Sequence, residues 1–166
     1  CALPICPDSP GFANGRGIAA RFSRPYGIAV MVDSSILVAD QDNNRIRRVT
    51  LDGDVTTYAG TGVAGNANGF RTDAQFNRPQ DVTIVNYNVY VSDHDNHLIR
   101  KVDEGGTVTT FSGSGVQGFV DDLGTNAQFF GQEGLAANPN GSEIWIADGN
   151  NGDGDPFNRV RRLPLP

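Results

Sequence analysis

Short runs in which apolar and polar residues alternate recur along the chain, and turn-forming residues separate them. Alternation with a period of two is typical of half-buried β-strands. Asp-Ser-Ser, Asp-Asn-Asn and Asp-Gly-Asp stand between the first runs, and these residues form turns through side-chain hydrogen bonds or positive φ. The pattern predicts four short strands in the first third of the chain, at Gly27–Val32, Ile36–Asp40, Arg45–Thr50 and Val55–Ala59.

The same pattern occurs three times. Phe22, Phe76 and Phe129 lie in the similar segments "ARFSRPYGIAV", "AQFNRPQDVTI" and "AQFFGQEGLAA", 54 and 53 residues apart. Four short antiparallel strands in a unit of about 50 residues is the plan of a β-propeller blade. One blade cannot bury both of its faces, so blades must stack on neighbours. We therefore predict an all-β fold of three blades with four antiparallel strands each, half of a six-bladed propeller.

The predicted boundaries follow this repeat. The segment before the first repeat contains both cysteines and is interpreted as the outer strand and linker of a preceding blade. The last repeat lacks its fourth strand. The linker and the three blades span residues 1–19, 20–73, 74–126 and 127–166.

The landmarks within each unit resemble the NHL repeat. They are "FSRPYGIAV", "ILVADQDNNRIRRV" and "VTTYAG" in the first unit, and Asn-His-Leu at 96–98 spells the name of the repeat. The resemblance implies a β-propeller and implies little about function, because blades of this family serve unrelated roles. The chain departs from the pattern at Asp81, which replaces the glycine seen at Gly27, at Gln132, which replaces a proline, and in an insertion in the third unit.

An aspartate ends the second strand of each unit, and an arginine follows it in the third strand. "DHDNHLIRKV" at 93–102 contains both, together with two histidines. Because the aspartate and the arginine recur, we interpret them as structural ion pairs in which the carboxylate also accepts hydrogen bonds from turn amides. The pairs are Asp40 with Arg47, Asp93 with Arg100, and Asp148 with Arg161.

The two histidines, His94 and His97, do not recur, since the first unit has Gln41 and Asn44 in their places. A zinc site needs three or four ligands, and the resemblance implies that members with lyase activity use several histidines from different blades. Two histidines in one loop therefore favour neither a metal site nor a catalytic site. We expect no enzyme activity and no cofactor.

The insertion in the third unit, "DGNNGDGDPFN" at 148–158, alternates oxygen-bearing side chains with glycines, as calcium loops do. The order of these residues departs from that of an EF-hand loop, and the final glutamate is missing. A solvated polar loop is therefore favoured over a calcium site. The candidate calcium ligands would be Asp148, Asn150, Asp153 and Asp155.

Composition and charge narrow the class of partner. Hydrophobic residues make up 38% of the 166 residues and charged residues 19%, as in globular proteins. No apolar run approaches the roughly 20 residues that cross a bilayer, so we expect no membrane insertion. A net charge of −6 repels phosphate backbones, which disfavours nucleic acid as a partner. Protein partners remain.

Two features suggest an extracellular location. Cys1 and Cys6 suit a disulfide within the chain, or a bridge to a neighbouring module, in an oxidising compartment, although two free thiols are the alternative. Asn140 begins the N-glycosylation pattern Asn-Gly-Ser in a turn-like context.

The two ends of the repeat complement each other. Residues 1–6 align with the outer strand from Val55, and Leu3 and Ile5 would share one face of that strand because side chains alternate. Such a strand could pair, through main-chain hydrogen bonds, with the last strand of another copy, at Arg159, Val160 and Leu163. Two copies in a head-to-tail ring, an open polymer, or a longer chain with further blades would each cover the exposed blade faces.

We therefore expect a non-enzymatic extracellular structural module that assembles through its blade edges with other blades or copies. The alternative is a ligand-binding or metal-binding propeller of a secreted enzyme or receptor.

Overall fold

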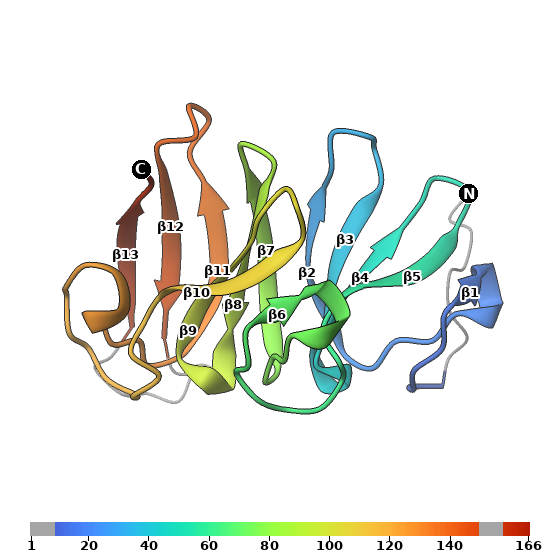
Figure 1. Ribbon diagram of the computed structural model, residues 1–166, viewed down its shortest axis with the longest axis horizontal. Coiled ribbons are helices and arrows are strands. Elements are labelled where there is room, and N and C mark those ends of the chain that lie inside the picture. The colour runs from blue at the N-terminus through green and yellow to red at the C-terminus, as the bar shows by residue number, and fades with distance from the viewer. Residues whose placement is uncertain (1–8, 150–157) are drawn as a thin grey trace.

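A computed structural model describes residues 9–149 and 158–166 of the chain, which form three antiparallel β-sheets side by side (Figure 1). The first sheet has the order β1-β5-β4-β3-β2, the second β6-β10-β9-β8-β7, and the third β11-β12-β13. The strands of the first sheet are β1 (Gly15–Arg16), β2 (Pro25–Val30), β3 (Ile36–Asp40), β4 (Arg45–Val49) and β5 (Asp54–Ala59). Those of the second are β6 (Gly69–Phe70), β7 (Pro79–Val85), β8 (Asn88–Asp93), β9 (Leu98–Val102) and β10 (Thr107–Ser112). Those of the third are β11 (Gln132–Ala137), β12 (Glu143–Asp148) and β13 (Arg159–Pro164).

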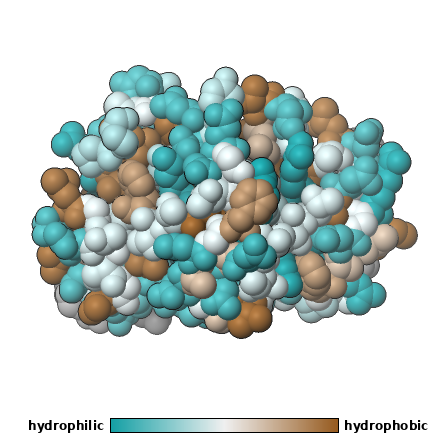
Figure 2. Space-filling view, in the orientation of Figure 1, coloured by the Kyte–Doolittle hydropathy of each residue, from teal (hydrophilic) through white to brown (hydrophobic). Residues whose placement is uncertain are grey.

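Five short 3₁₀ helices occur in the described residues: η1 (Gly17–Ala19), η2 (Gln41–Asn43), η3 (Arg71–Asp73), η4 (His94–Asn96) and η5 (Gly124–Asn126). The described residues contain no helix with the length and apolar character needed to cross a bilayer. Hydrophilic residues (teal) cover much of the face shown in Figure 2, with apolar residues (brown) between them.

The prediction of an all-β fold built from antiparallel propeller-type blades is confirmed. Four strand ends in the first sheet differ from the sequence prediction by one or two residues, since β2 spans Pro25–Val30, β4 ends at Val49 and β5 begins at Asp54. The innermost strand of the first sheet begins at Pro25 rather than Gly27, because a bulge before Ile28 keeps Pro25 paired with Asp40. Each of the first two sheets also has a fifth strand of only two residues. It lies in the segment before the innermost strand and pairs antiparallel with the outer strand, at Gly15–Arg16 and Gly69–Phe70.

The sheets pack face to face, which places two apolar cores between them. Leu37, Ala39 and Ile46 of the first sheet meet Val82 and Val91 of the second. The second core contains side chains of the second and third sheets, including Tyr90, Ile99, Phe129, Ile144 and Ile146. The face of each sheet that packs on the preceding one is called the front face below, and the opposite face is called the back face.

One hydrogen bond repeats at each segment that leads into a blade. The backbone N–H groups of three glycines donate to the carbonyl oxygens of the three repeat phenylalanines. These bonds are 3.0, 3.2 and 3.0 Å long and join Gly11 to Phe22, Gly65 to Phe76 and Gly118 to Phe129. The segments before the three blades therefore share one register.

Candidate functional site

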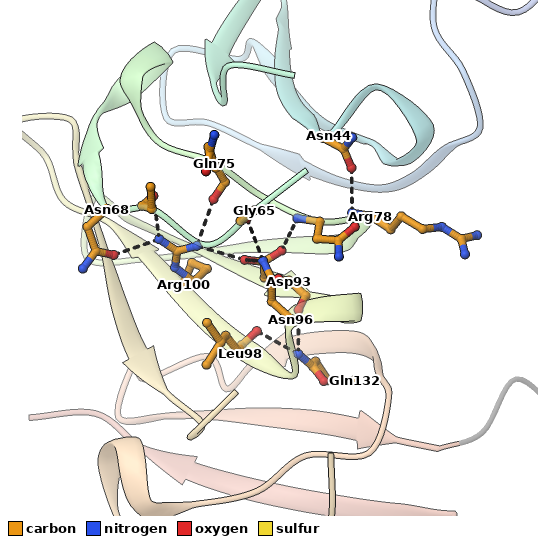
Figure 3. Close-up of polar contacts among 12 residues, drawn as sticks. Asn44, Gly65, Asn68, Gln75, Arg78, Asp93, Asn96, Leu98, Arg100 and Gln132 are labelled. Atoms are coloured by element: carbon orange, nitrogen blue, oxygen red, sulfur yellow. Dashed lines mark hydrogen bonds and ion pairs between the residues drawn. The ribbon is translucent and has the colours of Figure 1, made fainter. Parts of the chain in front are cut away.

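The side chain of Asp93 lies at the centre of a buried polar network (Figure 3). It ends β8, where η4 turns the chain back toward β9. The Asn77 backbone N–H donates to its Oδ1 over 2.7 Å, and the Asn96 amide and the Arg100 guanidinium donate to its Oδ2 over 2.8 and 2.9 Å. Burial raises the pKa of Asp93 to about 6, against the opposing effect of these donors. The carboxylate is therefore charged at neutral pH and paired with Arg100.

Arg100 holds the segment that connects the first sheet to the second. Its guanidinium donates to the carbonyl oxygens of Gln75 and Ala67, over 2.9 and 3.2 Å, and to Asn68 Oδ1 over 2.8 Å. These acceptors are 25 to 33 residues away in the sequence. The pair thus fixes the connecting segment against β9, which is a structural task.

The structure brings together the aspartate and the arginine of all three predicted pairs. Arg47 lies 2.7 Å from Asp40, and Arg161 lies 3.1 Å from Asp148. Arg47 also donates to Ala13 O and Asn14 Oδ1, as Arg100 does to the corresponding residues of the second unit. In the third unit an acidic residue takes the place of the asparagine, so Arg161 also contacts Asp121, at 2.9 Å.

Asp148, one of the four calcium candidates, has protein partners for both carboxylate oxygens. The backbone N–H groups of Phe130 and Gly131 donate to Oδ1, and Arg161 donates to Oδ2. The other candidates, Asn150, Asp153 and Asp155, lie outside the described residues. Within the described ranges, no group of three or more His, Cys, Asp or Glu side chains is arranged to hold a metal ion.

His94 and His97 line a cleft between the second and third sheets. The cleft has a volume of about 330 Å³ and is lined by Arg78, His94, Asp95, His97, Gln117, Phe130, Gly131 and Gly149. His94 Nδ1 lies 2.7 Å from Asp95 Oδ1. His97 has a left-handed backbone with φ of 54°, close to the 51° of Asn44, its counterpart in the first unit.

Burial lowers the pKa of His97, and a hydrogen bond to the Phe130 backbone opposes this effect. The folded protein therefore binds this proton less well than the unfolded chain does. The stability that neutral His97 contributes is present above its unfolded pKa of about 6.5 and is lost as the pH falls toward the lowered folded value.

We expect His97→Asn to gain stability relative to the natural chain as the pH falls from about 7.5 to 5.5. Asparagine suits the site because Asn44 adopts the same conformation in the first unit. Urea unfolding of both proteins at the two pH values measures the effect. Asp93 changes stability with pH in the opposite sense, but it is present in both proteins and does not contribute to their difference. A stability difference that does not change with pH would contradict the prediction.

Two departures from the repeat join neighbouring blades. The Gln132 amide donates to the carbonyl oxygens of Asp93 and Leu98, over 3.1 and 2.8 Å. Asp81 Oδ2 accepts from the Leu135 N–H over 2.7 Å, and burial raises the pKa of Asp81. A Cβ on Gly27 would lie 2.6 Å from the Asp81 Cα, so the first blade needs glycine there. Neither role was predicted from the sequence, where only the break in the repeat marks these residues.

Some of the remaining predicted residues lie within the described part of the chain, and others lie outside it. Asn140 is exposed in the turn between β11 and β12. Arg159 and Val160 are exposed on β13, whereas Leu163 is buried in the core between the second and third sheets. Cys1, Leu3, Ile5 and Cys6 lie outside the described residues.

No protein-family model matches the chain. Sequence comparison finds the human "NHL repeat-containing protein 2", 33% identical over 127 residues, which cover 70% of this chain and 17% of that protein. The bovine protein of the same name is 39% identical over 88 residues, which cover 52% of this chain and 12% of that protein. The chain belongs to the NHL-repeat β-propeller family. It thus spans less than a fifth of these NHL relatives.

Solved structures similar to this NHL chain are propeller-type folds. A structural genomics protein of unknown function from Bacteroides thetaiotaomicron is 25% identical with a TM-score of 0.72, over 83% of this chain and 35% of that one. An auxiliary nutrient binding protein from Bacteroides ovatus is 20% identical with a TM-score of 0.69, over 88% and 39%. A gluconolactonase from Xanthomonas campestris is 16% identical with a TM-score of 0.60, over 84% and 43%. Binding proteins and enzymes share this architecture, so the fold alone does not specify the function.

Proposed function

We propose that this chain is a non-enzymatic structural scaffold of NHL blades whose end faces bind a second copy of the chain. The observation that carries the proposal is on the front face of the first sheet. Ile28 on β2 is 62% exposed, whereas its counterparts in the second and third sheets, Val82 and Leu135, are 2% and 9% exposed. The same apolar position is covered by a preceding blade in two sheets and uncovered in the first.

Other apolar side chains on this front face are exposed as well. Tyr26 and Val30 are exposed beside Ile28 on β2, and a smaller core lies next to them, made of Ala20, Phe22, Val38, Val49 and Val55. An uncovered apolar face of this kind marks a site of protein contact. Because the equivalent face of the second sheet packs on the back face of the first, the complementary partner is the back face of a blade.

The third sheet supplies such a back face. Trp145, Ala147 and Val160 occupy the positions of Leu37, Ala39 and Ile46, which are fully buried between the first two sheets. In the third sheet all three residues are exposed. The back face of one copy therefore matches the front face of another in both position and chemistry.

This contact joins two different surfaces and is heterologous, so it produces either a closed ring or an open filament. The chain spans 35 to 43% of the three similar solved structures described above. Two copies would supply about as many blades as one of those chains, which favours a ring of two copies.

The outer edge of the third sheet adds a second contact. Among the described strands, β13 pairs only with β12, and a cleft of about 340 Å³ runs along it, lined in part by Arg159–Leu163. Outer strands β5 and β10 occupy this place in the other two sheets. A strand from residues 1–6 of the second copy, with Leu3 and Ile5 on one face, would complete the blade by β-augmentation.

We also propose an extracellular location, supported by the cysteines at positions 1 and 6 and by the exposure of Asn140 in a turn. Glycosylation requires an accessible asparagine in the Asn-X-Ser/Thr pattern. Material secreted from cells that glycosylate proteins should therefore lose mass on glycosidase treatment, whereas Asn140→Gln should not. An unchanged mass of the natural chain would remove this support.

Sedimentation velocity of the natural chain tests the assembly. We expect a species of two chains, or larger species if the contact propagates as a filament. A chain that stays monomeric at high micromolar concentration would contradict the proposal.

A further inference from the structure

A cleft lies between the second and third repeats, beside residues that differ from their counterparts in the first repeat. An aspartate ends the second long strand of each repeat (β3, β8 and β12). The residue after it is Gln41 in the first repeat, His94 in the second and Gly149 in the third. Gln41 is 1% exposed, so its side chain is fully buried. The residue two positions after the repeat phenylalanine is Arg24 in the first repeat, Arg78 in the second and Gly131 in the third. The two glycines of the third repeat leave the cleft of about 330 Å³ that contains both histidines of the chain.

The hydrogen bond to Asp95 orients the ring of His94. Because Asp95 Oδ1 accepts from Nδ1, the neutral ring carries its proton there and leaves Nε2 free to take a second proton. Nε2 lies 3.2 Å from the position that a Cβ on Gly131 would take, so the glycine makes room for this edge of the ring. Protonated His94 thus presents an N–H donor on the side of Gly131.

Protonation of His94 gives its surroundings a positive charge. Arg78 stands beside the pair, with its guanidinium 3.7 Å from Asp95 Oδ2. Asp148, on the neighbouring sheet, is neutralised by Arg161. Arg78 balances the charge of Asp95 while His94 is neutral, so protonation of His94 leaves one positive charge in excess, which an anion would stabilise. The Nδ1 atom of His97 is buried in the same cleft without a hydrogen-bond partner in the described residues.

We propose that this cleft binds a small organic carboxylate. The planar fork of Arg78 matches the two oxygens of a carboxylate, protonated His94 donates a further hydrogen bond, and Phe130 at the cleft wall contacts the apolar body of the ligand. The volume lies at the lower end of the range for small-molecule sites. All residues of the cleft belong to one chain, so binding does not require assembly of the blades.

The test uses benzoate as the probe, with benzamide as its uncharged counterpart. The chain contains two histidines, so its imidazole NMR signals can be followed one by one through a pH titration. Saturating benzoate should raise the pKa of His94 by about one unit, which corresponds to about tenfold tighter binding to the protonated ring. Benzamide should leave that pKa unchanged. If benzoate moves neither histidine signal, the proposal fails.

Two variants and one control locate the site. Arg78→Gln and His94→Gln should each weaken benzoate binding by at least about tenfold, measured by saturation transfer to the benzoate protons. Glutamine suits position 94 because the first repeat carries Gln41 there. Arg24→Gln should leave binding within about twofold, since Arg24 is the counterpart of Arg78 in the first repeat, with φ of 51° against 52°, and lies outside the cleft.

Inorganic phosphate separates a carboxylate site from a general anion site. We expect phosphate to raise the pKa of His94 by much less than benzoate does at equal concentration. Equal shifts with phosphate, or an equal loss of binding in Arg24→Gln, would overturn the proposal.

Discussion

Replacing Arg100 with alanine should lower the free energy of unfolding by about 3–5 kcal/mol, the cost of leaving a buried charge without its partner. The Asp93 carboxylate would keep the Asn77 and Asn96 donors but would lose its counter-ion in a fully buried position. The carbonyl oxygens of Gln75 and Ala67 would also lose their donor. Urea unfolding monitored by circular dichroism measures the change, with the dependence on denaturant concentration expected to stay the same.

The neighbouring residue provides the control for this substitution. Lys101 follows Arg100 on β9 and is only partly buried, so Lys101→Ala should change stability by less than about 0.5 kcal/mol. Adding Asp93→Ala to Arg100→Ala should cost less than the sum of the two single changes, because it removes the unpaired charge. A loss below about 1 kcal/mol in Arg100→Ala would rule out a structural role for the pair.

The fold and the ion pairs could be predicted because the residues that form them recur in all three units. An aspartate such as Asp93 occurs at the same point of every unit, and what the units have in common is their strands and turns. Its recurrence therefore indicates a structural role. Alternation with a period of two gave β3 its bounds to the residue, because turn-forming residues flank this strand on both sides. Repetition thus separates structural residues from residues particular to one blade.

The cleft and the contacts between blades could not be predicted, because they depend on segments that are far apart in the chain. Asn44 accepts a hydrogen bond from the Arg78 N–H across 34 residues, and Gln132 reaches the backbone of Asp93 across 39. Nothing local to Gly131 indicates that its missing side chain makes room for His94. The signal available in the sequence was the departure from the repeat, which marks a difference without giving its geometry.

The largest expected effect on assembly is that of Ile28→Lys, which should convert the assembled species to monomers. Removing the apolar side chain loses about 1.5–3 kcal/mol of burial, a factor of roughly 10 to 100 in affinity, and a lysine placed against an apolar back face adds a desolvation cost. Leu51→Lys is the matched control. Leu51 is 80% exposed against 62% for Ile28, but it lies in the turn between β4 and β5, away from the front face.

A substitution that places a charge on the opposite end face tests how the copies are joined. Val160 is exposed on the back face of β13, so Val160→Lys should also yield monomers if front meets back. Mixing the two variants should then restore a dimer through one interface, because the intact front face of the Val160→Lys chain meets the intact back face of the Ile28→Lys chain. Neither variant has a partner for itself, so this dimer contains one chain of each and cannot close into a ring. If Val160→Lys alone still dimerised, two front faces would meet in the assembly, and the head-to-tail arrangement would be wrong.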